Sequence, residues 1–145
     1  MIVLAVLGIA ILVFRGLGFA GIESLASWEV STRFGLGVMF LFTATAHFTS
    51  MKKDLERMIP SWVLYPRAMV YFTGVCEILG AMGLFIPSLQ MIAGIGLIIF
   101  LIAVLPANIN AARTGSTLRG NPPTPLALRI PMQILFILLI WWSAI

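Results

Sequence analysis

Glu77 is the residue of this chain with the clearest chemical potential, because it is a lone carboxylate inside the apolar run of residues 68–86. Placing a carboxylate at the centre of a bilayer costs about 2.5 to 3.5 kcal/mol on insertion scales, and such groups are usually functional. A protonated Glu77 could donate a hydrogen bond to a ligand carbonyl or relay a proton. The alternative role is an interhelical hydrogen bond that only specifies helix packing.

His47 is the only histidine of the chain. Its charge can change near neutral pH, which suits a proton relay or a ligand contact, and the alternative is an interfacial residue bonded to backbone or water. We therefore take Glu77 and His47 as the candidate catalytic residues. A metal site made by the two is disfavoured, because one histidine is a poor ligand set and we expect the residues at different depths. Counted from Pro66 at 1.5 Å per residue, Glu77 lies about 16 Å inside, whereas His47 lies at a helix end.

Further polar side chains occur at the ends of apolar segments. Asn108 and Asn110 follow Pro106, which removes a helical hydrogen bond, so the two amides could either satisfy freed carbonyls or line a ligand pocket. Arg129 and Gln133 open the last apolar segment. We expect these groups to share one pocket with His47, with Glu77 deeper.

Composition requires that these side chains be positioned by membrane helices. The 145 residues are 61% hydrophobic and 10% charged, with a mean hydropathy of +1.09. Soluble domains carry about 25% charged residues. The net charge of +4 does not indicate nucleic-acid binding, because the basic residues lie in short connections between apolar runs. The single cysteine, Cys76, excludes an intrachain disulfide.

Five apolar segments are long enough, or nearly so, to cross a bilayer. They cover residues 2–20, 33–48, 66–86, 89–112 and 129–145. We predict an all-α integral membrane protein with one transmembrane domain over residues 1–145. In a four-span alternative, the first segment lies in the membrane interface.

The distribution of charge predicts the orientation of the chain. Most Lys and Arg residues flank the second-to-third and fourth-to-fifth connections. By the positive-inside rule these connections are cytoplasmic, which puts the N-terminus inside and the C-terminus outside. The four-span alternative would put the N-terminus outside.

Several short motifs, in this order, resemble the DoxX-like family of small bacterial membrane proteins. They are RFGLGVMFLF at 33–42 with His47 and Phe48, Met58-Ile59-Pro60, VYFTGVCEILGA at 70–81, AVLPANI at 103–109 and RIPMQ at 129–133. The resemblance implies a four-helix transmembrane bundle over residues 32–145 in the bacterial cytoplasmic (inner) membrane, with an additional N-terminal helix within residues 1–22. It also implies functional roles at the matching positions, which are His47, Glu77, Pro106, Asn108 and Gln133.

The expected function follows from Glu77 together with this resemblance. We expect the protein to be a redox-associated membrane subunit that holds a quinone or another lipophilic ligand between its helices. The expected ligand-binding residues are Tyr71, Thr73, Asn108, Gln133 and Arg129, and no metal site is expected. The expected partners are membrane lipid, a redox protein and further copies of the chain, with no nucleic acid. A non-enzymatic assembly subunit and a small oligomeric transporter remain as alternatives, so enzymatic activity stays open.

Overall fold

The computed structural model describes residues 2–122 and 124–145, and its regular elements in these ranges are all helical, which confirms the predicted all-α class. The elements are α1 (Ile2–Phe19), the short 3-10 helix η1 (Glu23–Leu25), α2 (Trp28–Phe48), α3 (Lys52–Met58), α4 (Pro66–Phe85), α5 (Gln90–Thr114) and α6 (Leu126–Ala144). Helices α1, α4, α5 and α6 are each long and apolar enough to cross a membrane. A fifth span is counted if α2 and α3, bent by 92° at their junction, form one broken span.

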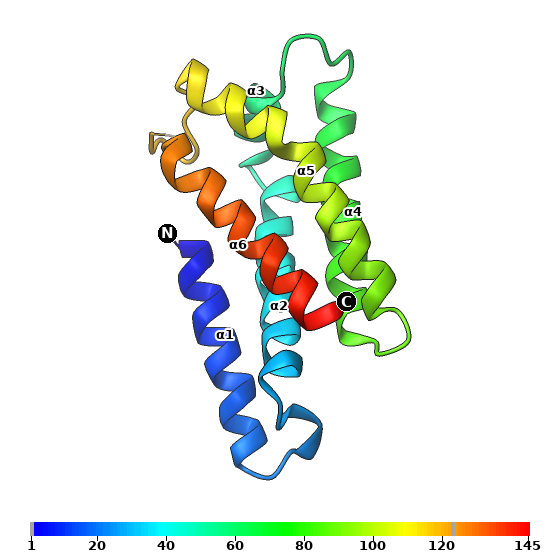
Figure 1. Cartoon of the computed structure of the whole chain (residues 1–145). Helices are drawn as coiled ribbons and strands as arrows, with labels where there is room; N and C mark the ends of the chain where they lie inside the picture. Colours follow the sequence, from blue (N-terminus) through cyan, green and yellow to red (C-terminus); the bar gives the residue numbers. More distant parts are fainter. Residues whose placement is uncertain (1, 123) are drawn as a thin grey trace.

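Four of the long helices pack in a closed ring (Figure 1). Helix α2 packs against α4 and α6, and α5 packs against the same two helices. Helix α1 lies outside this ring and packs mainly along α2. Helix α3 contacts α2, α4 and α5 at one end of the ring, which we call the α3 end, while η1 and the α4–α5 turn lie at the other, the η1 end.

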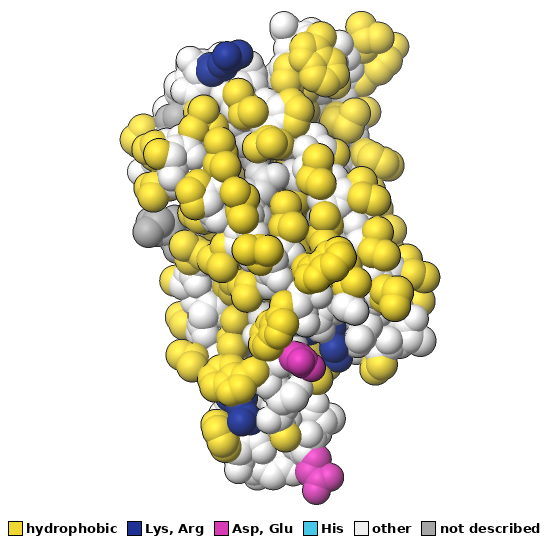
Figure 2. Space-filling view, in the orientation of Figure 1, with side chains coloured by type: hydrophobic (Ala, Val, Ile, Leu, Met, Phe, Trp, Pro, Cys, Tyr) yellow, Lys and Arg dark blue, Asp and Glu magenta, His cyan; other side chains and the backbone are white. Residues whose placement is uncertain are grey.

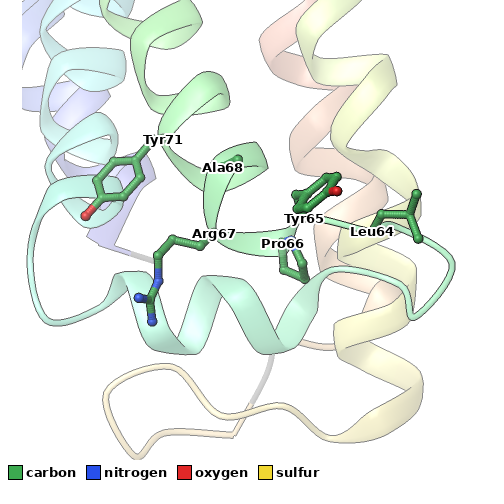
Figure 3. Close-up of a pocket in the computed structure, with 6 residues that line it drawn as sticks. All are labelled: Leu64, Tyr65, Pro66, Arg67, Ala68 and Tyr71. Carbon is green, nitrogen blue, oxygen red and sulfur yellow. The ribbon is translucent and has the colours of Figure 1, made fainter.

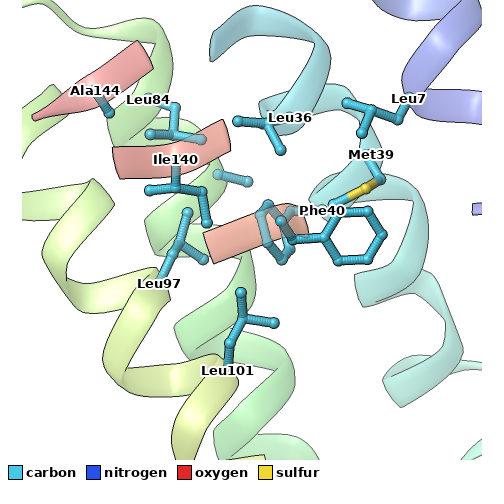
Figure 4. Packing of buried hydrophobic residues seen from close by; sticks show 11 residues of the cluster. Leu7, Leu36, Met39, Phe40, Leu84, Leu97, Leu101, Ile140 and Ala144 are labelled. Atoms are coloured by element: carbon cyan, nitrogen blue, oxygen red, sulfur yellow. The ribbon is translucent and has the colours of Figure 1, made fainter. Parts of the chain in front are cut away.

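The centre of the ring is filled with aliphatic side chains from every helix that forms it. Leu36 of α2, Leu84 of α4, Leu97 of α5 and Ile140 of α6 are no more than 1% exposed, and Figure 4 shows them packed together. Such close packing of helices usually depends on small residues at the contacts. Gly80 fulfils this expectation, because a Cβ there would lie 2.6 Å from Leu97 Cδ2.

The outer surface of the helices is also apolar. Figure 2 shows one face covered largely by hydrophobic side chains, with charged groups gathered toward its two ends. A soluble monomer rarely exposes a continuous apolar surface of this extent. The exposed apolar surface therefore agrees with the apolar composition and with helices that are able to cross a membrane.

One helix boundary and one whole helix differ from the sequence prediction. Helix α2 begins at Trp28 rather than at Arg33, capped by Ser27, whose Oγ accepts from the Val30 amide at 3.2 Å. Residues 29–33 are polar enough to interrupt an apolar run, but nothing in them prevents a helix, so the hydropathy pattern placed the start too late. Helix α3, within a region expected to be only a connection, was not predicted at all.

Candidate functional site

His47 and Glu77 face each other between α2 and α4. His47 Nε2 lies 3.3 Å from Glu77 Oε2, and the two side chains are 14% and 6% exposed. A glycine permits this approach, since a Cβ on Gly74 would lie 2.6 Å from His47 Cβ. The packing of α2 against α4 thus brings the only histidine of the sequence onto its most buried carboxylate.

The surroundings of the pair fix which nitrogen carries a permanent proton. His47 Nδ1 lies 2.7 Å from the carbonyl oxygen of Val70. A carbonyl can only accept a hydrogen bond, so Nδ1 is the donor. Nε2 is then the nitrogen that can gain or lose a proton opposite Glu77. The Thr43 hydroxyl donates to the other oxygen of Glu77, and Thr73 Oγ1 lies 3.3 Å from His47 Nδ1.

The expected difference in depth between His47 and Glu77 is wrong. Glu77 contacts Thr43 and His47, which lie in the last two turns of a helix that ends at Phe48. Because Nδ1 of His47 reaches the Val70 carbonyl, the part of α4 before Val70 extends past the end of α2. His47 is therefore level with Val70 of α4 and not with Pro66, which brings its side chain within reach of Glu77. Within residues 2–122 and 124–145, no group of three or more His, Cys, Asp or Glu side chains could hold a metal ion.

A second polar cluster lies between α5 and α6. Arg129 Nη1 donates to Asn108 Oδ1 at 2.9 Å, and Asn108 Nδ2 lies 3.5 Å from Gln133 Oε1. Gln133 in turn donates to the carbonyl of Leu101, about one turn ahead of Pro106. Among the described residues no hydrogen bond joins this cluster to His47 or Glu77. The single pocket expected from the sequence is therefore two separate clusters.

Tyr71 and Asn110 make contacts unrelated to either cluster. The Tyr71 hydroxyl accepts from Lys52 Nζ at 3.0 Å, and its ring centroid lies 5.9 Å from that of Phe48. Asn110 Nδ2 donates to the Met58 carbonyl at 2.9 Å. Both contacts tie α3 or its neighbourhood to the ring. Of the residues expected to bind a ligand, only Thr73 lies beside the His47–Glu77 pair.

Arg33 is a buried polar residue whose importance the sequence analysis did not identify. It is 7% exposed, and it donates from Nε to the Leu84 carbonyl at 3.1 Å and from Nη1 to the Ser143 carbonyl at 3.3 Å. These carbonyls lie in the last turns of α4 and α6, where no further turn satisfies them. Helical spacing could have revealed Arg33, because it shares one face of α2 with Leu36 and His47.

Comparison with known proteins identifies a family but no function. A family model described as a domain of unknown function, DUF8561, matches residues 36–144, which is more than half of the chain and leaves α1 outside the match. This match overturns the resemblance to the DoxX-like family. Most positions of the motifs behind that resemblance are glycine, proline or apolar residues, which are frequent in membrane helices in general, and the polar positions among them are few. No curated protein and no solved structure matches the chain.

Proposed function

The chain belongs to the DUF8561 family of domains of unknown function, and from that premise and the site geometry we propose that it is a membrane protein whose His47–Glu77 pair shares a proton with a lipid-soluble ligand. The single observation that carries the proposal is the contact of His47 Nε2 with Glu77 Oε2 at 3.3 Å while Nδ1 is committed to the Val70 carbonyl. One proton between Nε2 and Oε2 can be offered to, or taken from, a third hydrogen-bonding group.

Membrane placement is supported by the spans and by charge. Four helices are long and apolar enough to cross a membrane, and seven of the nine Lys and Arg residues flank the connections at the α3 end. The positive-inside rule makes this end cytoplasmic in a cytoplasmic membrane. The Ile2 end of α1 then lies inside and the Ala144 end of α6 outside. In this proposal α2, α4, α5 and α6 form the transmembrane bundle, and α1 is an additional span.

The packing favours a ligand at the edge of the bundle. The centre is occupied by Leu36, Leu84 and Leu97, which leaves little room for a ligand between the four helices. His47 is partly exposed, and Thr73 beside it is also partly exposed. A ligand dissolved in lipid could reach this edge between α2 and α4. Neutral molecules that bear a carbonyl group, quinones among them, have the acceptor that a protonated pair would bind.

Transport through one copy is less well supported. Along α2, the residues between Thr43 and Arg33 on the ring side are Leu36, Met39 and Phe40, all buried in the apolar core. A proton or ion that reached Thr43 from the α3 end would meet no further polar side chain on this face before Arg33. The site is therefore one-sided, which suits binding and proton exchange better than conduction.

The presence of a single histidine allows a direct test. Nitrogen-15 labelling of histidine, in a chain without a histidine tag, gives NMR signals from His47 alone. We expect an Nδ1-bound proton, and an Nε2 signal that shifts when decyl-ubiquinone is added to the protein in micelles. Glu77→Gln should weaken this response about tenfold, which corresponds to about 1.4 kcal/mol.

Thr45→Val is the matched control, because the one side-chain bond of Thr45 among the described residues is to the carbonyl of Phe42 on its own helix. It should leave the response unchanged. A His47 signal that ignores decyl-ubiquinone, with both proteins folded, would contradict ligand binding and favour a pair that only specifies packing in an assembly subunit. An equal response in the wild type and Glu77→Gln would place the ligand elsewhere.

A further inference from the structure

An open hollow of 470 Å³ lies over the first turn of α4, away from the His47–Glu77 pair. Figure 3 shows Arg67 reaching from this turn toward α3, with Leu64 and Tyr65 on one side and Tyr71 on the other. The complete lining is Leu64, Tyr65, Pro66, Arg67, Ala68 and Tyr71. The hollow thus combines a largely apolar wall with one guanidinium group and two phenol groups.

The apolar side chains around the hollow are unusually exposed. Leu64, Tyr65 and Trp62 are 86%, 75% and 74% exposed, and they lie in the connection between α3 and α4. Aromatic residues of this kind concentrate where a membrane helix meets the headgroup region. In the proposed orientation, the hollow therefore opens at the level of the cytoplasmic headgroups, where acyl chains begin.

Charge at the hollow is suited to a phosphate. Arg67 Nε donates to Glu56 Oε1 at 2.9 Å, and among the described residues no hydrogen bond involves its two Nη groups. A guanidinium fork binds phosphate through paired N–H donors. Lys52 is held nearby by its bond to the Tyr71 hydroxyl at 3.0 Å, and Lys53 is exposed on the same short helix. Helix α3 also carries Asp54, which pairs with Arg57 at 3.5 Å, so Lys52, Lys53, Arg57 and Arg67 outnumber the carboxylates of Asp54 and Glu56 at this end and the local charge favours an anion.

We propose that the hollow binds one anionic phospholipid of the cytoplasmic leaflet. Its phosphate lies at the Nη groups of Arg67, and an acyl chain runs along Leu64 and Ala68. The inference rests on the membrane placement made under the proposed function, and it is independent of the His47–Glu77 pair. Its consequence is a preference for phosphatidylglycerol over phosphatidylcholine at this end of α4.

Native mass spectrometry of the full chain, released from micelles with equal amounts of dioleoyl phosphatidylglycerol and dioleoyl phosphatidylcholine, tests the proposal. The wild type should retain phosphatidylglycerol preferentially. Arg67→Gln should reduce the preference about tenfold, as expected for the loss of a charge-assisted contact. Arg113→Gln is the matched control, because Arg113 is equally an exposed arginine at the α3 end but lies outside the hollow.

A second variant tests the apolar wall without changing charge. Ala68→Phe should fill the hollow and reduce retention of phosphatidylglycerol, while circular dichroism shows an intact helical fold. Equal preferences in Arg67→Gln and Arg113→Gln, or full retention in Ala68→Phe, would overturn the site. Arg67→Gln should keep the His47 response to decyl-ubiquinone, so loss of the lipid site and failure of the proposed function give different results.

Discussion

The two ends of α2 bury polar side chains on the same helix face, but they satisfy them in different ways. At the η1 end, Arg33 donates to two backbone carbonyls, from Leu84 and Ser143. At the α3 end, His47 faces the carboxylate of Glu77 at 3.3 Å. One end therefore holds a fixed charge against fixed acceptors, and the other holds two groups that can exchange a proton.

This difference separates a structural role from a chemical one. A guanidinium stays charged at any pH at which proteins fold. Its acceptors lie at the C-terminal ends of α4 and α6, where the helix dipole favours a cation. Arg33 thus joins three helices of the ring with a charge that does not change. The His47–Glu77 pair, by contrast, can change its protonation state. Burial is therefore not by itself evidence of function, since Arg33 and Glu77 are buried to a similar degree.

The largest expected effect is on the free energy of unfolding, when the fixed charge of Arg33 is removed. Arg33→Met removes two hydrogen bonds from a charged donor, each worth about 1.5 to 3 kcal/mol, and part of this loss is offset by relief of desolvation. We expect unfolding in micelles to be easier by about 2 to 4 kcal/mol, by the same amount at acidic and alkaline pH.

Arg15→Met is the control for this experiment. Arg15 lies over the rings of Phe19 and Trp28, at 4.0 and 5.2 Å from their centroids, so its loss should cost about 1 kcal/mol or less. A cost for Arg33→Met that disappears at one pH would contradict the contrast between the two ends of α2.

The next effect concerns the contact that brings the titratable pair together. Gly74→Ala places a Cβ 2.6 Å from His47 Cβ and must push α2 away from α4. Overpacking of this kind costs about 1 to 3 kcal/mol. The pair should separate, which histidine-selective NMR would detect as a changed Nε2 signal.

Gly96→Ala is the matched substitution, because nothing described lies within 4 Å of a Cβ at Gly96. It should be neutral or stabilise the helix by up to about 1 kcal/mol. If both alanine variants behave alike, the close approach at Gly74 is not what positions His47.

A smaller effect is expected for the coupling free energy between His47 and Glu77. A double-mutant cycle with His47→Gln and Glu77→Gln should give a coupling free energy of about 0.5 to 3 kcal/mol, as for residues in direct contact. The coupling should change with pH, because the charge of a histidine changes near neutral pH. Additive effects at every pH would show that the two side chains do not interact.

The smallest expected effect tests whether the two polar clusters are independent of each other. Asn108→Ala removes the acceptor of Arg129 and should cost about 1 kcal/mol. It should leave the His47 NMR signals unchanged, since no hydrogen bond among the described residues links the clusters. A shifted His47 signal would mean that Asn108, Glu77 and His47 form one functional site after all.

Much of the fold could be predicted because hydropathy directly reports which segments leave water. The apolar runs identified α1, α4, α5 and α6 to within a few residues. Helix α3 escaped prediction because it is short and polar, and it is held by contacts such as that of Asn110 with the Met58 carbonyl rather than by its own pattern. The resemblance to the DoxX-like family was wrong because short motifs within apolar helices carry little information about descent.

The sequence by itself determined that Glu77 is a carboxylate in an apolar helix and that His47 is the only histidine of the chain. Residue types and local runs carry that information. Only the tertiary structure decided that the two meet, that Asn108, Gln133 and Arg129 form a different cluster, and that Arg33 joins the ends of α4 and α6. The physical reason is that helix register and rotation depend on close approaches such as that at Gly74, which involve residues distant along the chain.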